Sequence, residues 1–329
     1  MANNDAGYDL DYYFIFVFIT FLYTFSLWPN MKIGLIDVDN KNFPNLALMK
    51  ISAYHKSIGD TVEFVVENSW YNTVYKSKVF TFTPDIKINF TCFGETIIGG
   101  TGYNIKSKLP EEIDSMIPDY SLYDCEHAYG FITRGCPNKC EWCIVPEKEG
   151  TIQPYSSIDH FIGNYKSAVI MDNNILASDY GIKQIERIID LKVKVDFNQG
   201  LDSRLIDDAM AKLLSKVKWL HPIRLACDNS NSFNALHKAV ENLRWRNCKP
   251  QRYFVYTLVK DVPEAMERVK RIKGIYCEPF CQPYRNFKTN EEPTKEQKRF
   301  SRWVNITSVF NSVWWEDYKY NDEYSARYK

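Results

Sequence analysis

The chain has 329 residues, of which 45% are hydrophobic and 25% charged, so it is long enough for two domains and has a globular composition. This composition excludes a disordered chain, a collagen and a polytopic membrane protein. The 41 Lys and Arg residues balance the 41 Asp and Glu residues, so a globally basic nucleic-acid binder is not indicated.

The first 30 residues form a hydrophobic N-terminal segment. The stretch from Tyr12 to Trp28 has no charge and nine aromatic residues, and it is at the lower limit of the about 17–25 residues that span a bilayer. Acidic residues precede it and no small-residue cleavage site follows, which argues against a secretory signal. Three interpretations stay open: a membrane anchor, an extension outside the fold, and a helix packed on the domain. As an anchor it would tether a cytoplasmic body, because Lys32 follows it.

Residues 31–125 are predicted to form a small Rossmann-like, doubly wound α/β domain. The apolar run Lys32–Val38 predicts a buried first strand, and Pro44–Ser57 has the apolar spacing of a helix with Pro44 in its first turn. Thr61–Val66 is the next predicted strand. Further strands are expected at Lys78–Thr83 and Ile86–Phe90, and a turn at Gly99–Gly102.

Residues 126–290 show a longer alternation of strands and helices. Strands are predicted at Tyr129–Thr133, Ala168–Met171, Val193–Asn198, Ile223–Cys227, Tyr253–Thr257 and Gly274–Glu278. Helices are predicted at Tyr180–Asp190, Ile206–Lys216, Ser232–Leu243 and Pro263–Ile272. Repeated βα units predict a parallel sheet, and six of them predict a partial (βα)6 TIM-like barrel. Residues 291–329 are expected to form a helical C-terminal tail, with a Trp-rich helix over Lys295–Tyr318.

Three of the nine cysteines form a C-x3-C-x2-C motif directly after the first strand of this second domain. Cys136, Cys140 and Cys143 are close enough in sequence for three thiolates to converge on one metal centre. Structural zinc sites usually take four protein ligands from two separated cysteine pairs, whereas cubic iron–sulfur clusters are held by cysteines. Three thiolates leave one iron open to a non-protein ligand. A zinc knuckle or a chance cluster is the alternative.

This motif resembles the signature of the radical S-adenosylmethionine (SAM) superfamily, C-x3-C-x-(aromatic)-C, with Trp142 as the aromatic residue. The resemblance implies that the three cysteines bind a [4Fe–4S] cluster whose open iron chelates SAM. One electron then cleaves SAM and starts radical chemistry on a substrate. It also implies that Trp142 lies near the adenine, and that a flavodoxin- or ferredoxin-type protein donates the electron.

The resemblance also implies SAM-binding residues at the ends of the following strands. Asp172 or Asn173 is expected to accept a hydrogen bond from the SAM amino group, although both residue types also cap helices. Arg204 is expected to pair with the SAM carboxylate. Gln199 and Asp202 are expected to meet the ribose hydroxyls, with Asp228-Asn229 as a weaker candidate pair after the fourth strand.

Within the superfamily the chain is most similar to the group with an N-terminal cobalamin-binding-like domain, which includes methylthiotransferase-like members. The likeness covers most of residues 31–285 and is specific over Cys136–Gly150. Methylthiolation or methylation of an RNA, a protein or a small molecule is thereby implied. The D-x-H-x-x-G motif of histidine-ligated cobalamin domains is missing, because residues 37–43 hold neither His nor Gly. Cobalamin is therefore not expected.

Two further features have a plain and a functional interpretation. Cys277 and Cys281 repeat the C-x3-C spacing but lack further ligands for an auxiliary cluster, so core thiols are expected. The stretch Lys295–Trp303 holds basic residues among aromatic ones. This mixture is typical of some nucleic-acid binders, and also of an amphipathic helix that closes the barrel. The alternative function is a non-catalytic iron–sulfur or zinc protein that binds nucleic acid.

Overall fold

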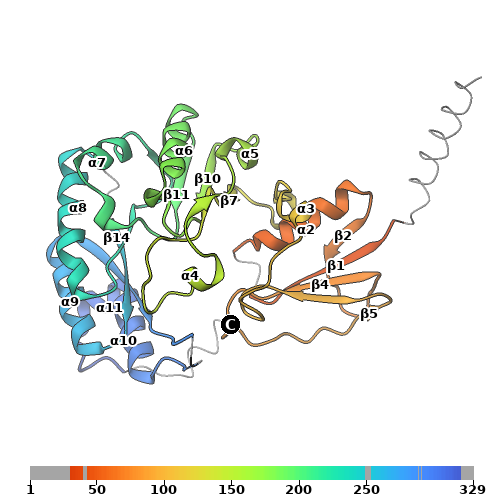
Figure 1. The fold of residues 1–329 in the computed structure, drawn as a ribbon. Coiled ribbons are helices and arrows are strands. Elements are labelled where there is room, and N and C mark those ends of the chain that lie inside the picture. Colours follow the sequence, from red (N-terminus) through yellow and green to blue (C-terminus); the bar gives the residue numbers. More distant parts are fainter. Residues whose placement is uncertain (1–29, 40–42, 249–252, 288, 290, 320–329) are drawn as a thin grey trace, which may run out of the picture. The chain divides into compact units, whose positions relative to one another are not determined.

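The computed structural model describes residues 30–319, except 40–42, 249–252, 288 and 290 (Figure 1). The chain divides into two compact units between Leu122 and Tyr123, called here the N-terminal and C-terminal units. The predictions for residues 12–28 lie outside the described residues. In the part of the chain that the structure describes, no helix is both long and apolar enough to cross a membrane.

The N-terminal unit is built on a four-stranded parallel sheet in the order β2-β1-β4-β6. Its strands are β1 (Lys32–Asp37), β2 (Thr61–Phe64), β4 (Thr73–Ser77) and β6 (Thr96–Gly99). A two-stranded parallel pair joins β3 (Trp70–Tyr71) and β5 (Thr91–Cys92), and the helices are α2 (Leu46–Ser57) and α3 (Glu111–Asp114), with a 3-10 turn at Tyr120–Tyr123. Helix α2 begins after Asn45, whose side chain accepts a hydrogen bond from Leu48 N, so Pro44 precedes the cap instead of entering the first turn.

The two faces of this sheet are covered differently. On one face, α2 and α3 bury apolar side chains of β1. The core there consists of Ile33, Leu35, Leu48, Ile51 and Ile113. On the other face, Tyr71 and Val74 pack with Ile86 and Phe90, which belong to an irregular segment. The parallel α/β sheet is as predicted, but a loop occupies the face where a doubly wound sheet would place helices.

The strands predicted at Lys78–Thr83 and Ile86–Phe90 are wrong, because both stretches are irregular. The carboxylate of Asp39 explains the first stretch: it accepts hydrogen bonds from the backbone N–H groups of Val79 and Phe80 and from the Thr83 hydroxyl. Backbone donors held by a side chain are unavailable to a neighbouring strand. The sheet instead uses β4 and β6, which the sequence pattern did not indicate.

The C-terminal unit has two parallel sheets. The first has the order β12-β11-β10-β7 and consists of β7 (Ala128–Gly130), β10 (Ser167–Ile170), β11 (Lys194–Phe197) and β12 (Lys218–Trp219). The second consists of β13 (Arg224–Ala226), β14 (Tyr253–Val259) and β15 (Cys277–Pro283), in that order. A parallel bridge between Leu201 and Leu225 joins the two sheets. All six predicted strands are present, which confirms an α/β fold with parallel strands.

Helices and short elements connect these strands (Figure 1). The helices are α4 (Val145–Lys148), α5 (Ile158–Ile162), α6 (Asp179–Asp190), α7 (Asp208–Leu214), α8 (Phe233–Trp245) and α9 (Val262–Gly274). The 3-10 turns are Ile175–Ala177, Ser203–Leu205 and Ser230–Ser232, and an antiparallel pair joins β8 (Thr133–Arg134) to β9 (Gln153–Pro154). The last strand starts three residues later than predicted, because Gly274 ends α9 and Tyr276, with φ +55°, turns the chain.

The C-terminal tail packs on the second sheet. It has two helices, α10 (Lys295–Asn305) and α11 (Thr307–Ser312), because Ile306 adopts an extended conformation and interrupts the single helix predicted over Lys295–Tyr318. Phe300 and Trp303 are buried against Val259 and Cys281. These contacts assign the tail's aromatic residues to a core.

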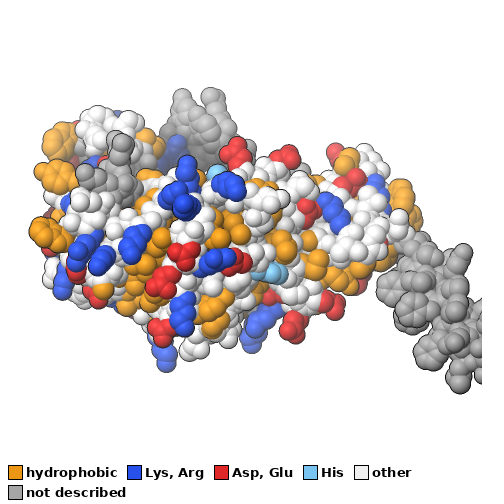
Figure 2. Space-filling model, turned by 90° about the horizontal axis from the view of Figure 1, so that it is seen from above, with side chains coloured by type: hydrophobic (Ala, Val, Ile, Leu, Met, Phe, Trp, Pro, Cys, Tyr) orange, Lys and Arg blue, Asp and Glu red, His pale blue; other side chains and the backbone are white. Residues whose placement is uncertain are grey.

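One basic residue of the tail, Arg299, has its partners inside the fold. Arg299 donates hydrogen bonds to the carbonyl oxygens of Trp315 and Tyr318 and stacks on the Trp315 ring. On the face of the molecule in Figure 2, basic and acidic side chains are interspersed. The bonds of Arg299 to the tail's own backbone do not support the nucleic-acid interpretation of the tail.

Candidate functional site

The carboxyl ends of parallel strands lie at one edge of a sheet, and ligand sites of α/β proteins are built there. In the C-terminal unit, four loops leave this edge after β7, β10, β11 and β13. The first carries the three cysteines on residues 135–144, called here the cysteine loop. The other loops carry Asn174, Asp202 and Asp228, and hydrogen bonds or charges connect each of them to the cysteine loop.

The cysteine loop opens at a position that only glycine can occupy. Gly135 has φ +85°, and a Cβ atom there would lie 2.4 Å from the carbonyl oxygen of Thr151. The next residue, Cys136, donates its backbone N–H to Gly150 O at 3.2 Å. Because β8 and β9 also pair at the base of the loop, both of its ends are fixed.

Glu149 lies beyond the cysteine loop and anchors the segment that follows it. Its carboxylate accepts hydrogen bonds from Arg134 Nη2 at 2.6 Å, from Gly135 N at 3.0 Å and from Asn173 Nδ2 at 2.7 Å. Arg134 also lies over the Phe131 ring, 4.0 Å from its centroid. A single carboxylate thus joins the start of the cysteine loop, and the segment that follows the loop, to the end of β10. The sequence analysis missed Glu149, because an acid six residues beyond the last cysteine has no distinguishing pattern.

The three thiols lie within electrostatic range of one another. Burial raises the pKa of Cys140, the charge of Arg204 opposes that rise, and Cys136 adds to it. Cys143 is the exposed member of the three. Partial desolvation by its neighbours raises its pKa, and Cys140 and Cys136 contribute to the rise. Among the described residues, no three His, Cys, Asp or Glu side chains converge closely enough to hold one metal ion. A cubane does not require that convergence, because each thiolate binds a different iron atom.

Asp202 is the centre of the polar contacts beside the thiols. Its Oδ2 accepts hydrogen bonds from Asn138 Nδ2 at 3.1 Å and Asn174 Nδ2 at 3.2 Å. Arg204 binds it through two nitrogens, at 2.8 Å and 2.6 Å. Burial raises the pKa of Asp202, but the hydrogen bonds and charge of Arg204 outweigh it, so the pKa lies below its ordinary value. An ionised, arginine-paired carboxylate therefore lies beside the cysteine loop.

Two amide oxygens at this edge lack hydrogen-bond partners. Asn174 Oδ1 and Asn198 Oδ1 are buried without a donor within the described residues. The amide nitrogen of Asn174 lies 3.7 Å from Cys136 Sγ as well as contacting Asp202. Buried acceptors are normally satisfied, so unpaired ones at a site edge indicate a missing donor such as a ligand ammonium.

The structure gives Asp172 a different role from the predicted one. Its two oxygens accept hydrogen bonds from Ile132 N, from Thr133 N and from the Thr133 hydroxyl, at 2.7, 2.6 and 2.5 Å. Burial raises the pKa of Asp172 to about 6, although these hydrogen bonds act against the rise. Asp172 thus binds the strand that precedes the cysteine loop. Asn173 gives its amide nitrogen to Glu149, and Gln199 is exposed.

Trp142 is positioned by an acid from another strand. Its indole is hydrogen-bonded to the carboxylate of Asp228, which follows β13. Burial raises the pKa of Asp228, while the nearby charge of Arg268 and the bond from Trp142 act against the rise. Asp228 was a weak candidate from sequence. Arg268 was missed, because in helix α9 its i,i+4 spacing from Glu264 is typical of an exposed ion pair.

The two cysteines of the second C-x3-C spacing lie outside this site. Cys277 and Cys281 are buried thiols on β15, where burial raises their pKa values to about 11 and about 12. In the N-terminal unit, His55 uses both ring nitrogens, at 2.7 Å from Asp60 Oδ2 and 3.0 Å from the Tyr75 hydroxyl. Neither ring nitrogen of His55 is available to a metal in this arrangement.

Comparison with known proteins gives matches to solved structures alone. No family model and no curated protein matches the chain. SuiB of Streptococcus suis bound to the precursor peptide SuiA is 12% identical over 56% of this chain and 45% of that chain, with a TM-score of 0.39. SuiB without a stated ligand has 12% identity, the same coverage of this chain, 46% of that chain and a TM-score of 0.38.

SuiB bound to S-adenosylmethionine is 11% identical over 56% of this chain and 48% of that chain, with a TM-score of 0.39. The alignments thus span less than half the length of the solved chains.

Proposed function

We propose that this chain is a radical SAM enzyme whose cluster is held by Cys136, Cys140 and Cys143. One observation carries the proposal: three thiols occupy one glycine-opened loop at the carboxyl edge of parallel strands, beside an arginine–aspartate pair. When bound, a [4Fe–4S] cluster with one open iron supplies the electron that cleaves SAM and starts radical chemistry.

The side chains around the three thiols support a cluster that has no fourth protein ligand. Asp202 and Asp228 act electrostatically on Cys140 but are bound to Arg204 and Trp142. The remaining six cysteines include four buried ones, Cys227, Cys248, Cys277 and Cys281. One corner of the cluster is therefore left for a ligand that brings its own nitrogen and oxygen atoms.

The polar groups beside the thiols suit the amino-acid end of SAM. Arg204 is exposed, with a side-chain exposure of 53%, and a guanidinium grips a carboxylate through two parallel bonds. The unpaired oxygens of Asn174 and Asn198 supply acceptors for an ammonium group, and the carboxylate of Asp202, hydrogen-bonded to Asn174, adds a negative charge beside them. We propose these residues in place of Asp172, whose oxygens are committed to the backbone. Gln199 and Asn173 stay candidates for the outer part of the ligand.

The fold is proposed to be a partial (βα)6 barrel. Six parallel strands follow one another as β7, β10, β11, β13, β14 and β15, and the Leu201–Leu225 bridge continues the array between the two sheets. Such an array places six strand ends around one site.

We propose a flavodoxin- or ferredoxin-type electron donor, and membrane contact through residues 12–28. Product analysis has to identify the substrate and whether it is methylated or methylthiolated.

Anaerobic purification and reconstitution test the proposal. We expect a brown protein that binds iron and sulfide and converts SAM to 5′-deoxyadenosine when dithionite is added. The Cys140→Ala variant should lose iron and turnover together, whereas Cys92→Ala, which changes a cysteine of the N-terminal unit, should keep both. Retention of full iron by the Cys140→Ala variant would refute the ligand assignment. A colourless protein containing zinc would support the non-catalytic alternative instead.

A further inference from the structure

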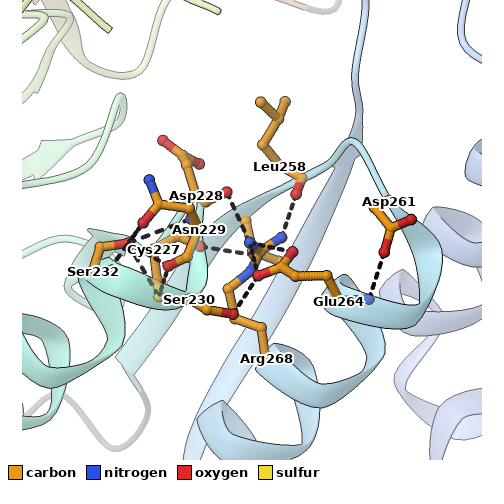
Figure 3. A network of polar contacts seen from close by, with 10 residues as sticks. Cys227, Asp228, Asn229, Ser230, Ser232, Leu258, Asp261, Glu264 and Arg268 are labelled. Atoms are coloured by element: carbon orange, nitrogen blue, oxygen red, sulfur yellow. Dashed lines mark hydrogen bonds and ion pairs between the residues drawn. The ribbon is translucent and has the colours of Figure 1, made fainter. Parts of the chain in front are cut away.

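Arg268 on α9 is a buried arginine that contacts the ends of two neighbouring strands (Figure 3). Its Nη1 donates to the carbonyl oxygen of Asp228 at 2.8 Å, and its Nη2 donates to the carbonyl oxygen of Leu258. Its Nε donates to the Thr257 hydroxyl at 2.7 Å, and Glu264 pairs with the guanidinium at 2.8 Å. The side chain of Arg268 is 1% exposed.

Burying an arginine costs stability that an apolar side chain of similar size would not cost. An arginine suits this position because the N–H groups of its planar guanidinium bind several acceptors in a fixed geometry. Here the acceptors are the backbone carbonyls after β13 and at the end of β14. Arg268 therefore holds the two strand ends in register.

Asp228 transmits this geometry to the cysteine loop. Its carbonyl oxygen binds Arg268, while its carboxylate is hydrogen-bonded to Leu258 N and to the Trp142 indole. The loop after Asp228 is itself fixed, because Asn229 and Ser232 form a reciprocal cap and Ser230 donates to Glu264. Trp142 lies between Cys140 and Cys143 in sequence, so a displacement of Asp228 changes the surroundings of both thiols.

We propose that Arg268 is a positioning residue for the cysteine loop, which acts through Asp228 on Trp142. The consequence for a cluster rests on the radical SAM function proposed above. If the three cysteines hold a cluster, this contact would keep Trp142 beside it. It also keeps the Asp228 carboxyl group near the two thiols that Trp142 separates. The structural part of the proposal holds for the protein with or without a cluster.

The structural part is tested by ¹⁹F NMR of the full chain labelled with 5-fluorotryptophan and free of cluster. The Trp142→Phe variant assigns the Trp142 line. We expect Arg268→Lys to move this line by more than its width, because one ammonium cannot bind all the acceptors of the guanidinium. Lys270→Met is the matched control on the same helix, since Lys270 is exposed and pairs with Glu267. The control should leave the line in place.

Two milder variants keep the test decisive if Arg268→Lys fails to fold. Thr257→Val removes the acceptor of Arg268 Nε, and Asp228→Asn replaces the carboxyl group that Trp142 contacts. Each should move the Trp142 line. An unmoved line in the variants that fold, or an equal shift in Lys270→Met, would overturn the proposal.

The reconstituted protein gives a second readout. Asp228→Asn should shift the midpoint potential of the cluster at unchanged iron content, because the polar groups around a cluster tune its potential. An unchanged potential overturns the proposed effect of Asp228 on the cluster. If the wild-type protein assembles no cluster, the proposed function fails, and the ¹⁹F result still decides whether Arg268 positions Trp142.

Discussion

Glu149 Oε2 accepts a hydrogen bond of 2.7 Å from Asn173 Nδ2, which ties the segment beyond the cysteine loop to the end of β10. The same carboxylate also binds Arg134 and the backbone of Gly135. The loop that carries the thiols is thus closed by an acid outside the cysteine motif. Stability of the loop and retention of a cluster should both depend on Glu149.

We expect Glu149→Gln to weaken iron retention by on the order of tenfold, as changes to groups that support metal ligands commonly do. The charge that pairs with Arg134 is lost, and the loop ends are held less firmly. Iron content after a challenge with a chelator measures the effect. Glu147→Gln changes an exposed acid two residues away and should match the wild type. Equal iron retention in the two variants would contradict the assigned role of Glu149.

Gly135→Ala should destabilise the C-terminal unit by more than about 3 kcal/mol. The substitution adds a backbone strain of order 1–3 kcal/mol at positive φ and places Cβ 2.4 Å from Thr151 O. Gly163→Ala, at φ +50° with open space around the Cβ position, carries the backbone strain alone. Denaturant unfolding of the two variants compares these effects, and a cost for Gly135→Ala no larger than that for Gly163→Ala would rule out the clash.

Asp172→Asn should lower the free energy of unfolding by about 2–3 kcal/mol, because an amide nitrogen then faces the donors of Thr133. The measurement is made at pH 8, where a carboxylate with a pKa of about 6 is ionised. Asp159→Asn is the control: Asp159 pairs with Arg187 at the surface, and such pairs contribute about 1 kcal/mol or less. A larger loss in the control would argue against this account of Asp172.

Trp303→Ala should cost about 3–5 kcal/mol, the range for removing a large buried aromatic side chain. Trp303 is 6% exposed and its indole donates to Val313 O at 2.9 Å. Trp314, on the same tail, is 79% exposed, and Trp314→Ala should change stability by about 0.5 kcal/mol or less. Thermal or denaturant unfolding distinguishes them. Similar costs for both variants would show that the tail does not pack as described.

Arg204→Gln should raise the pKa of Asp202, which the arginine lowers in the wild type. A carboxylate with a lowered pKa in the folded state stabilises the protein above its unfolded-state pKa, and this contribution is lost as pH falls through its folded-state value. The stability difference between wild type and Arg204→Gln should therefore persist from pH 8 to pH 5 and shrink below pH 4. A pH-independent difference would mean that the Arg204–Asp202 pair is not its source.

Much of the second domain was predictable from local sequence. Six of the strands of the C-terminal unit and helices α6, α7, α8 and α9 follow from apolar periodicity, because each buries one face against its neighbours. The N-terminal unit was predicted less well. The irregular segment over residues 78–90 contains β-forming residues, but the distant carboxylate of Asp39 takes up the backbone donors near its start.

The cysteine motif and its place after a strand were visible in the chain itself, because ligand spacing within one loop is a local property. The partners of the cysteine loop were not, since Glu149, Asn174, Asp202 and Asp228 meet it only when parallel strands bring their carboxyl ends to one edge. Asp172 shows what position alone does not reveal. Its place after a strand predicted that it binds SAM, yet its oxygens accept hydrogen bonds from the backbone of Ile132 and Thr133. Sequence determined which chemical groups reach this edge, and tertiary packing decided which of them bind one another and which are left for a ligand.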